Sequence, residues 1–164
     1  MKKIAVMMGS DSDLPIVEKA VNTLKEFGVP YEVHVFSAHR TPAQAQKFSE
    51  EARQNGFGAI ICAAGMAAHL AGAVAANTTL PVIGIPIQSK QLGGMDALLS
   101  TVQMPSGIPV ATVAIDGAVN AALLSIEILA VEDRLLADRL DAKRKADSDG
   151  VLEKNKAVEK RFQQ

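Results

Sequence analysis

Five short apolar runs, each followed by residues with helical spacing, constrain the fold of this chain most strongly. The runs lie at residues 3–8, 31–36, 59–63, 82–86 and 109–115. The first of them lacks any apolar–polar alternation, which is typical of a parallel strand buried on both faces. Strands that alternate with helices are joined by right-handed crossovers into a doubly wound sheet. We therefore expect an α/β protein with three αβα layers and a five-stranded parallel sheet.

Apolar residues at helical spacing fill the segments between these runs. They predict helices over residues 16–24, 42–55, 67–76 and 94–103. From Asn120 to about Lys145 the chain contains no Gly or Pro, which predicts one long C-terminal helix or two abutting ones. This length exceeds what one face of a small sheet needs, so we expect the distal part to pack on another subunit. A single domain is predicted over residues 1–146, followed by a weakly ordered polar tail over 147–164.

The charge and cysteine content exclude several classes of protein. A formal net charge of -1 gives no general attraction to nucleic acid or to acidic membranes. The lone Cys62 cannot form an intramolecular disulfide and is expected to be a small buried hydrophobe. Together with an N-terminal apolar run too short for a signal peptide, it predicts a cytoplasmic protein. The apolar stretch over residues 59–87 is broken by Gly, His, Asn and Pro, so it predicts strand, helix and strand, not a membrane span.

The hexapeptide Ser37–Pro42 lies where the second predicted strand passes into a helix. Thr41 is a suitable N-cap, Pro42 suits the first helical position, and Gln44 stands at the capping-box position. His39 and Arg40 therefore precede the N–H groups that begin a helix, where an anion is favoured. Arg40 disfavours a second positive charge on His39 and a bound anion would restore it, so this histidine is a candidate general acid/base.

Other polar residues have weaker signals. The loop over residues 9–13, Gly-Ser-Asp-Ser-Asp, could hold a phosphate or could simply cap the first helix. It lacks the dinucleotide and P-loop patterns, which favours a smaller phosphorylated ligand. His69 follows the third strand on the same edge as His39, but among so many alanines it could instead be buried against a backbone carbonyl. The glycines at 93 and 94 could form a mobile lid or only begin a helix, and no residue spacing predicts a metal site.

Four segments together resemble the N5-carboxyaminoimidazole ribonucleotide mutase family of de novo purine (IMP) biosynthesis. They lie at residues 8–13, 37–42, 68–70 and 100–110, and the resemblance extends over about residues 3–130. It implies a flavodoxin-like fold, a homo-octamer and a ribonucleotide substrate, with no nucleic-acid or membrane partner. It also implies an isomerase that moves a carboxylate from N5 to C4 of an aminoimidazole without ATP, metal, biotin or another cofactor.

The resemblance also assigns roles to individual residues. His39 would be the general acid/base. The residues that would bind substrate are Gly9, Ser10, Ser12, Asp13, Ser37 and Arg40 around the ribose phosphate, and Ala64, Gly65, His69 and Leu70 around the base and carboxylate. The chain departs from the usual family pattern at Met66, at Ala71 and in a short connection over residues 115–120.

Two other functions are open. The related carboxylases, which join free CO2 to aminoimidazole ribonucleotide, typically carry Lys-Gly after the histidine, and Arg40-Thr41 resembles the mutases instead. A non-catalytic flavodoxin-like module that binds a nucleotide or flavin would explain the fold and the phosphate loop, but it would leave His39 without a role.

Overall fold

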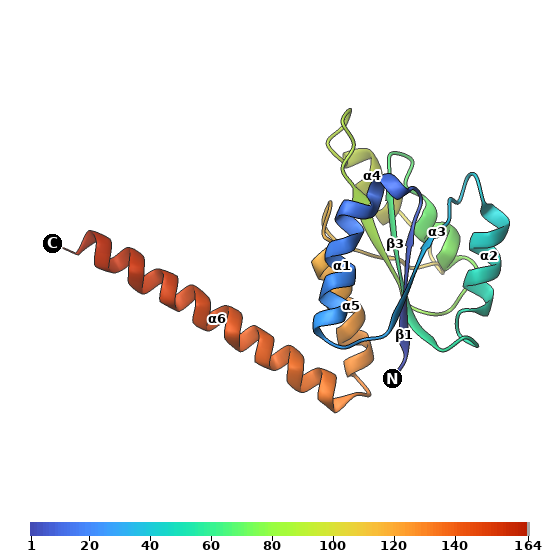
Figure 1. Cartoon of the computed structure of the whole chain (residues 1–164). Helices are drawn as coiled ribbons and strands as arrows, with labels where there is room; N and C mark the ends of the chain where they lie inside the picture. Colours follow the sequence, from blue (N-terminus) through green and yellow to red (C-terminus); the bar gives the residue numbers. More distant parts are fainter. Residues whose placement is uncertain (164) are drawn as a thin grey trace.

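The computed structural model describes residues 1–163 and shows a five-stranded parallel sheet between two layers of helices (Figure 1). The strands are β1 (Lys3–Met8), β2 (Tyr31–Val35), β3 (Phe57–Gly65), β4 (Val82–Ile87) and β5 (Ala111–Thr112). The helices are the short 3-10 turn η1 (Asp11–Asp13), α1 (Leu14–Glu26), α2 (Pro42–Glu51), α3 (Leu70–Ala75), α4 (Met95–Val102), α5 (Ala118–Ala130) and α6 (Arg134–Phe162). The strand order is β2-β1-β3-β4-β5, and each neighbouring pair is parallel. The predicted αβα fold is confirmed.

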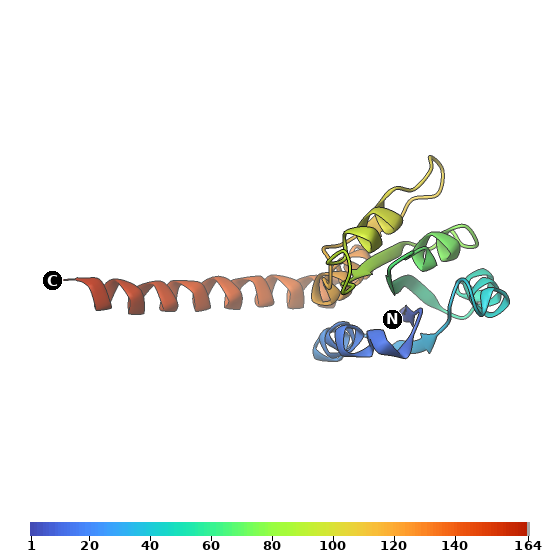
Figure 2. The same ribbon diagram turned by 90° about the horizontal axis from the view of Figure 1, so that it is seen from above.

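Each face of the sheet has its own apolar core. Helices α1 and α5 cover one face, where they pack on residues such as Val6, Ile61 and Ile85. Helices α2, α3 and α4 cover the other, and Ala5, Ile60 and Val82 belong to the core there. Figure 2 shows these two helical layers from above. The central strands are buried on both sides, which is why their sequences read as continuous apolar runs.

Cys62 lies within the second of these cores, on the central strand β3, and is 1% exposed. Burial raises the pKa of its thiol well above the usual range, because the thiolate would lose its hydration there. The prediction that this residue is a small buried hydrophobe is confirmed.

Three elements are clearly shorter than the sequence predicted. Helix α2 ends at Glu51 instead of residue 55, because residues 52–55 form turns. Strand β5 pairs with β4 only at Ala111 and Thr112, although the apolar run suggested residues 109–115. It is an edge strand, so one side of its backbone has no partner in the sheet, and the chain then turns at Asp116, whose φ is 56°. Helix α3 begins at Leu70 instead of residue 67, because residues 66–69 form a turn at the end of β3.

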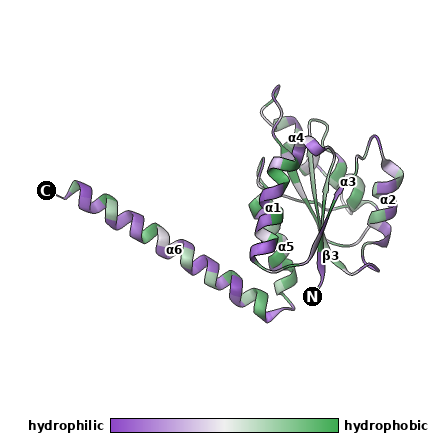
Figure 3. Ribbon diagram, in the orientation of Figure 1, coloured by the Kyte–Doolittle hydropathy of each residue, from purple (hydrophilic) through white to green (hydrophobic). Residues whose placement is uncertain are grey.

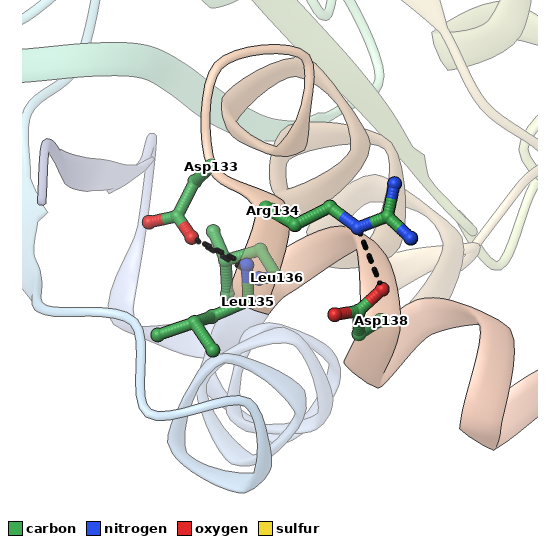
Figure 4. Close-up of polar contacts among 5 residues, drawn as sticks. All are labelled: Asp133, Arg134, Leu135, Leu136 and Asp138. Carbon is green, nitrogen blue, oxygen red and sulfur yellow. Dashed lines mark hydrogen bonds and ion pairs between the residues drawn. The ribbon is translucent and has the colours of Figure 1, made fainter.

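The long C-terminal segment forms two helices, one of the two arrangements that the sequence allowed. Helix α5 ends at Ala130 and α6 begins after Asp133, whose Oδ1 accepts hydrogen bonds from the N–H groups of Leu135 (3.1 Å) and Leu136 (3.2 Å) (Figure 4). This aspartate is a side-chain N-cap of the kind that fixes a helix start. Leu136 is fully buried, so the first turn of α6 is tied to the domain core.

The rest of α6 projects away from the domain (Figures 1 and 2). With 29 residues, α6 is about 43 Å long at 1.5 Å per residue. All residues from Arg144 to Gln163 are exposed, and the helix is largely hydrophilic along this length (Figure 3). The sequence predicted a weakly ordered tail from residue 147, whereas the structure continues the helix to Phe162. Gln164 lies outside the described residues, and the division into a domain and a tail stays a prediction.

Among residues 1–163, the helices are either too short or too polar to cross a membrane.

Candidate functional site

A cavity of about 510 Å³ opens at the carboxyl edge of the sheet, among the loops that follow β1, β2, β3 and β4. The chain passes from β2 to β3 across β1, so this edge includes the point where the strand order reverses, which is where doubly wound sheets bind ligands. The cavity has the size of a small-molecule site. All of the predicted site residues lie on its wall, namely Gly9, Ser10, Ser12, Asp13, Ser37, His39, Arg40, Ala64, Gly65, His69 and Leu70.

The loop after β1 presents two hydroxyls and a buried carboxylate. Ser10 Oγ accepts hydrogen bonds from the N–H (3.3 Å) and the hydroxyl (2.9 Å) of Ser12, so both serines face one spot at the start of η1. Asp13 is only 8% exposed. Burial raises its pKa above the usual range, and the neighbouring carboxylates of Asp11 and Asp116 add to this effect. Asp13 stands at the N-cap position of α1 but makes no side-chain hydrogen bond to that helix, whereas the Ser10 side chain caps η1.

The loop after β2 is held by Ser37 and Thr41. Ser37 Oγ accepts hydrogen bonds from the N–H groups of His39 (3.3 Å) and Arg40 (3.2 Å), which fixes the turn that carries them. Thr41 Oγ1 accepts from the Ser37 N–H at 2.8 Å and donates to the Ser37 carbonyl at 3.2 Å. Thr41 does stand at the N-cap of α2, but it makes no side-chain bond to that helix, so the predicted capping box with Gln44 is wrong. The hydroxyl shapes the turn instead.

Arg40 joins the loops after β1 and β2. Its Nη2 donates a hydrogen bond of 3.0 Å to the carbonyl oxygen of Gly9, although the side chain is exposed. The guanidinium therefore lies against the backbone of the β1 loop, at the residue before Ser10. A permanent cation, hydroxyl donors and backbone N–H groups are the usual partners of a phosphate.

His69 reaches the cavity from the start of α3, and its side chain is exposed. The alternative of a buried histidine bonded to a backbone carbonyl is therefore wrong. Its ring lies against Gly72, where an added Cβ would be only 2.5 Å from His69 Cε1. The imidazole can occupy this position only because residue 72 has no side chain.

The turn before His69 is unusual in its backbone. Met66 has a φ of 57°, a conformation that residues with a side chain rarely adopt. The Met66 carbonyl accepts the N–H of Ala68 at 2.8 Å, and the Ala68 carbonyl accepts the hydroxyl of Thr101 at 3.2 Å. The connection between β3 and α3 is thus held from two sides.

The sequence did not predict the fourth wall of the cavity, which is residues 87–91. It begins at Ile87, the last residue of β4, and its one charged residue is Lys90, so it contains no histidine or carboxylate that would indicate a general acid/base. Its place at the end of a central strand is the feature that could have pointed to it, because the carboxyl ends of parallel strands share one edge.

The assembled cavity brings together two imidazoles, one guanidinium, one ammonium, four serine hydroxyls and one buried carboxylate. Such a set can bind a phosphorylated ligand and can move a proton to and from it. Within the described residues, no group of three or more His, Cys, Asp or Glu side chains could hold a metal ion.

Comparison with known proteins gives a consistent result. The family model described as AIR carboxylase matches residues 3–149. The chain is 53% identical to the N5-carboxyaminoimidazole ribonucleotide mutase of Pyrococcus horikoshii, over 95% of this chain and 88% of that protein. It is also 53% identical to the enzyme of the same name from Bacillus subtilis, over 92% of this chain and 94% of that protein.

Solved structures agree with the sequence relatives. The crystal structure of Treponema denticola PurE superposes with a TM-score of 0.86 and 28% identity, covering 98% of each chain. A second crystal structure, of a variant of the PurE2 protein from Treponema denticola, superposes with a TM-score of 0.85 and 27% identity over the whole of both chains.

Proposed function

Because the chain belongs to the AIR carboxylase family, we propose that it is a mutase that converts N5-carboxyaminoimidazole ribonucleotide to 4-carboxy-5-aminoimidazole ribonucleotide in purine biosynthesis. The names of the relatives support this activity. One observation of this chain carries the proposal further: His39 and the phosphate-binding set around Arg40 share a single cavity. That pairing suits a reaction in which a bound ribonucleotide gains and loses one proton.

His39 is the general acid/base in this proposal. As imidazolium it donates a proton to N5 while the bond between N5 and the carboxylate carbon breaks, which releases CO2. C4 of the imidazole then attacks the CO2, and the neutral His39 removes the proton from C4. The proton given in the first step is recovered in the second, so one histidine can serve both.

The remaining residues bind the substrate. Ser10, Ser12, Ser37 and Arg40 hold the ribose phosphate, with Asp13 nearby for a ribose hydroxyl. The backbone at Ala64 and Gly65, with His69 and Leu70, lines the imidazole and its carboxylate. The CO2 must stay in the cavity between the two steps, which requires that the bound substrate and the surrounding loops exclude water.

The test is to mix the protein with N5-carboxyaminoimidazole ribonucleotide, without ATP, added metal or bicarbonate, and to follow the ultraviolet signal of the C4-carboxylated product. We expect rapid formation by the wild type and none by His39→Asn, which should still bind the product in calorimetry. Turnover only from aminoimidazole ribonucleotide and high CO2 would assign the chain to the carboxylases. No turnover from either compound, with flavin retained on purification, would favour a binding module.

We propose further that the protein is a cytoplasmic homo-octamer. An apolar stripe on α4 supports an assembly, since Met95, Leu99 and Val102 are 52%, 51% and 45% exposed at helical spacing. The projecting half of α6 adds Leu152 and Phe162, both exposed. A mass near eight times that of the chain in light scattering is the expected result, and a monomer would contradict the proposal.

A further inference from the structure

The loop between β4 and α4 is fixed at both ends and exposed at its tip. Asp116 Oδ1 accepts the N–H of Gln88 at 2.9 Å, and Ser89 Oγ donates to the Asp96 carboxylate at 3.2 Å. At the other end, Gly93 and Gly94 have φ values of 62° and 91°, which a side chain would disfavour. The loop rises at the carboxyl edge of the sheet next to α4 (Figure 1). Its exposed tip therefore extends from a defined base beside the cavity.

Lys90 is the charged residue of this tip, and it lies on the cavity wall. Among residues 1–163, no carboxylate comes within 4.0 Å of its ammonium. Arg40, also on the wall, is held at the opposite side by its bond to Gly9. The cavity thus has one permanent cation beside β1 and β2, and a second beside β4.

The sheet sets the separation between these two positions. Strand β4 is two intervals from β1 in the order β2-β1-β3-β4-β5. At about 4.8 Å per interval, the loops that follow β1 and β4 are about 10 Å apart. Arg40 is bonded to Gly9 in the loop after β1, whereas Lys90 follows β4, so the two cations come from different sides of the cavity and can serve different groups of one ligand.

We propose that Lys90 binds the carboxylate that the imidazole ring of the ligand carries. This inference rests on the proposed function, whose substrate and product have a phosphate at one end and a carboxylate at the other. The hydroxyls of Ser10 and Ser12 gather with Arg40 at the β1 end, which favours the phosphate there. The carboxylate then points across the cavity toward β4 and Lys90.

The role has a specific kinetic consequence. Substrate and product both carry the negative charge, whereas the CO2 released between them is neutral. Lys90 therefore strengthens binding of both stable ligands without favouring the step in which CO2 is free. An interaction that is made with the bound substrate and lost when CO2 is free lowers KM and kcat together and leaves kcat/KM almost unchanged.

The test compares two ligands that differ only in the carboxylate. Calorimetry measures Kd for 4-carboxy-5-aminoimidazole ribonucleotide and for 5-aminoimidazole ribonucleotide, with the wild type, Lys90→Met and Lys90→Arg. In Lys90→Met we expect Kd for the carboxylated ligand to rise about two- to fivefold, the range of an exposed ion pair, with Kd for the other ligand unchanged. Lys90→Arg should restore most of the loss. Lys19→Met, which removes the same charge from the exposed face of α1, is the matched control and should change neither Kd.

Two results would overturn the assignment. An equal loss of affinity for both ligands would mean that Lys90 contacts the phosphate, and no loss for either would mean that it contacts no ligand. Both measurements are of binding, so they remain informative if the wild type fails to turn over N5-carboxyaminoimidazole ribonucleotide, a result that would contradict the proposed function alone.

Discussion

Substitution of Gly72 by alanine tests how the fold positions His69. Gly72 is the third residue of α3, and a Cβ built on it would lie 2.5 Å from His69 Cε1, 2.9 Å from Nδ1 and 3.0 Å from Nε2. Contacts this short do not occur between such atoms, so the imidazole must leave its place. The ring is free to move because the side chain of His69 is exposed.

Two opposing contributions determine the change in stability. Alanine in place of glycine stabilises a helix by about 0.5–1 kcal/mol. Moving the ring of His69 out of its preferred rotamer costs about 0.5–1.5 kcal/mol. We therefore expect Gly72→Ala to change the free energy of unfolding by less than about 1 kcal/mol in either direction. The position of the imidazole changes nonetheless, and a displaced group near the reacting atoms should lower kcat/KM about tenfold or more.

A double-mutant cycle in urea separates the two contributions. In a His69→Ala background no ring opposes the new methyl group, so the helix gain of Gly72→Ala should appear in full. The difference between the two backgrounds is the coupling energy of the clash, and we expect about 0.5–1.5 kcal/mol. Equal effects of Gly72→Ala in both backgrounds would refute the reasoning. So would an unchanged kcat/KM in a variant whose histidine signal has shifted in nuclear magnetic resonance.

Two further predictions concern the carboxylates of Asp13 and Asp133. Burial raises the pKa of Asp13 above 3.8, so the ionised carboxylate lowers the stability of the folded protein at neutral pH. Asp13→Asn should therefore raise the free energy of unfolding near pH 7. This gain should disappear below about pH 3.8, where the carboxyl is protonated in both the folded and the unfolded protein. Urea denaturation at the two pH values checks this, and the same gain at both would contradict it. Asp133→Ala removes the cap of α6 and should cost about 1 kcal/mol. Asp138→Ala, which breaks only an exposed ion pair with Arg134, should cost about 0.5 kcal/mol or less, and equal losses would contradict the role of the cap.

The sheet could be predicted from the sequence because strands buried on both faces consist of continuous apolar residues. Strand β1 has the bounds that its apolar run indicated, Lys3–Met8. The length of the edge strand β5 was overestimated. Its bounds are set by hydrogen bonds to β4, and the apolar run of residues 109–115 extends beyond the residues that make them. An apolar run shows what is buried, but it does not show where pairing ends.

Helical order in the C-terminal segment was missed because the prediction relied on apolar residues. Local ion pairs at i,i+4 support this part of α6, including Lys143–Asp147 (2.8 Å) and Lys145–Asp149 (2.9 Å). Each such pair contributes only about 0.2–0.5 kcal/mol to a helix. The feature of the sequence that indicated this helix was therefore the i,i+4 spacing of opposite charges. The helix continues here without an apolar face.

The candidate site was predicted for three of its four loops. Ser10, His39 and His69 follow the first three strands and belong to segments with recognisable chemistry. The exposure of His69 was not predictable from its alanine-rich surroundings, because it depends on the space beside Gly72. The roles of the site residues stay predictions until the variants are measured.

Backbone strain gives a separate reason to regard the carboxyl edge as functional. Among residues 1–163, Met66 and Asp116 are the two residues other than glycine with positive φ. Each such conformation costs of the order of 1 kcal/mol or more and persists only where surrounding contacts hold it. Met66 lies on the cavity wall, and the Asp116 carboxylate holds the N–H of Gln88, where the loop of Lys90 begins. Both turns lie at the carboxyl edge of the sheet, so their strain supports the proposal that this edge places the ligand-binding groups.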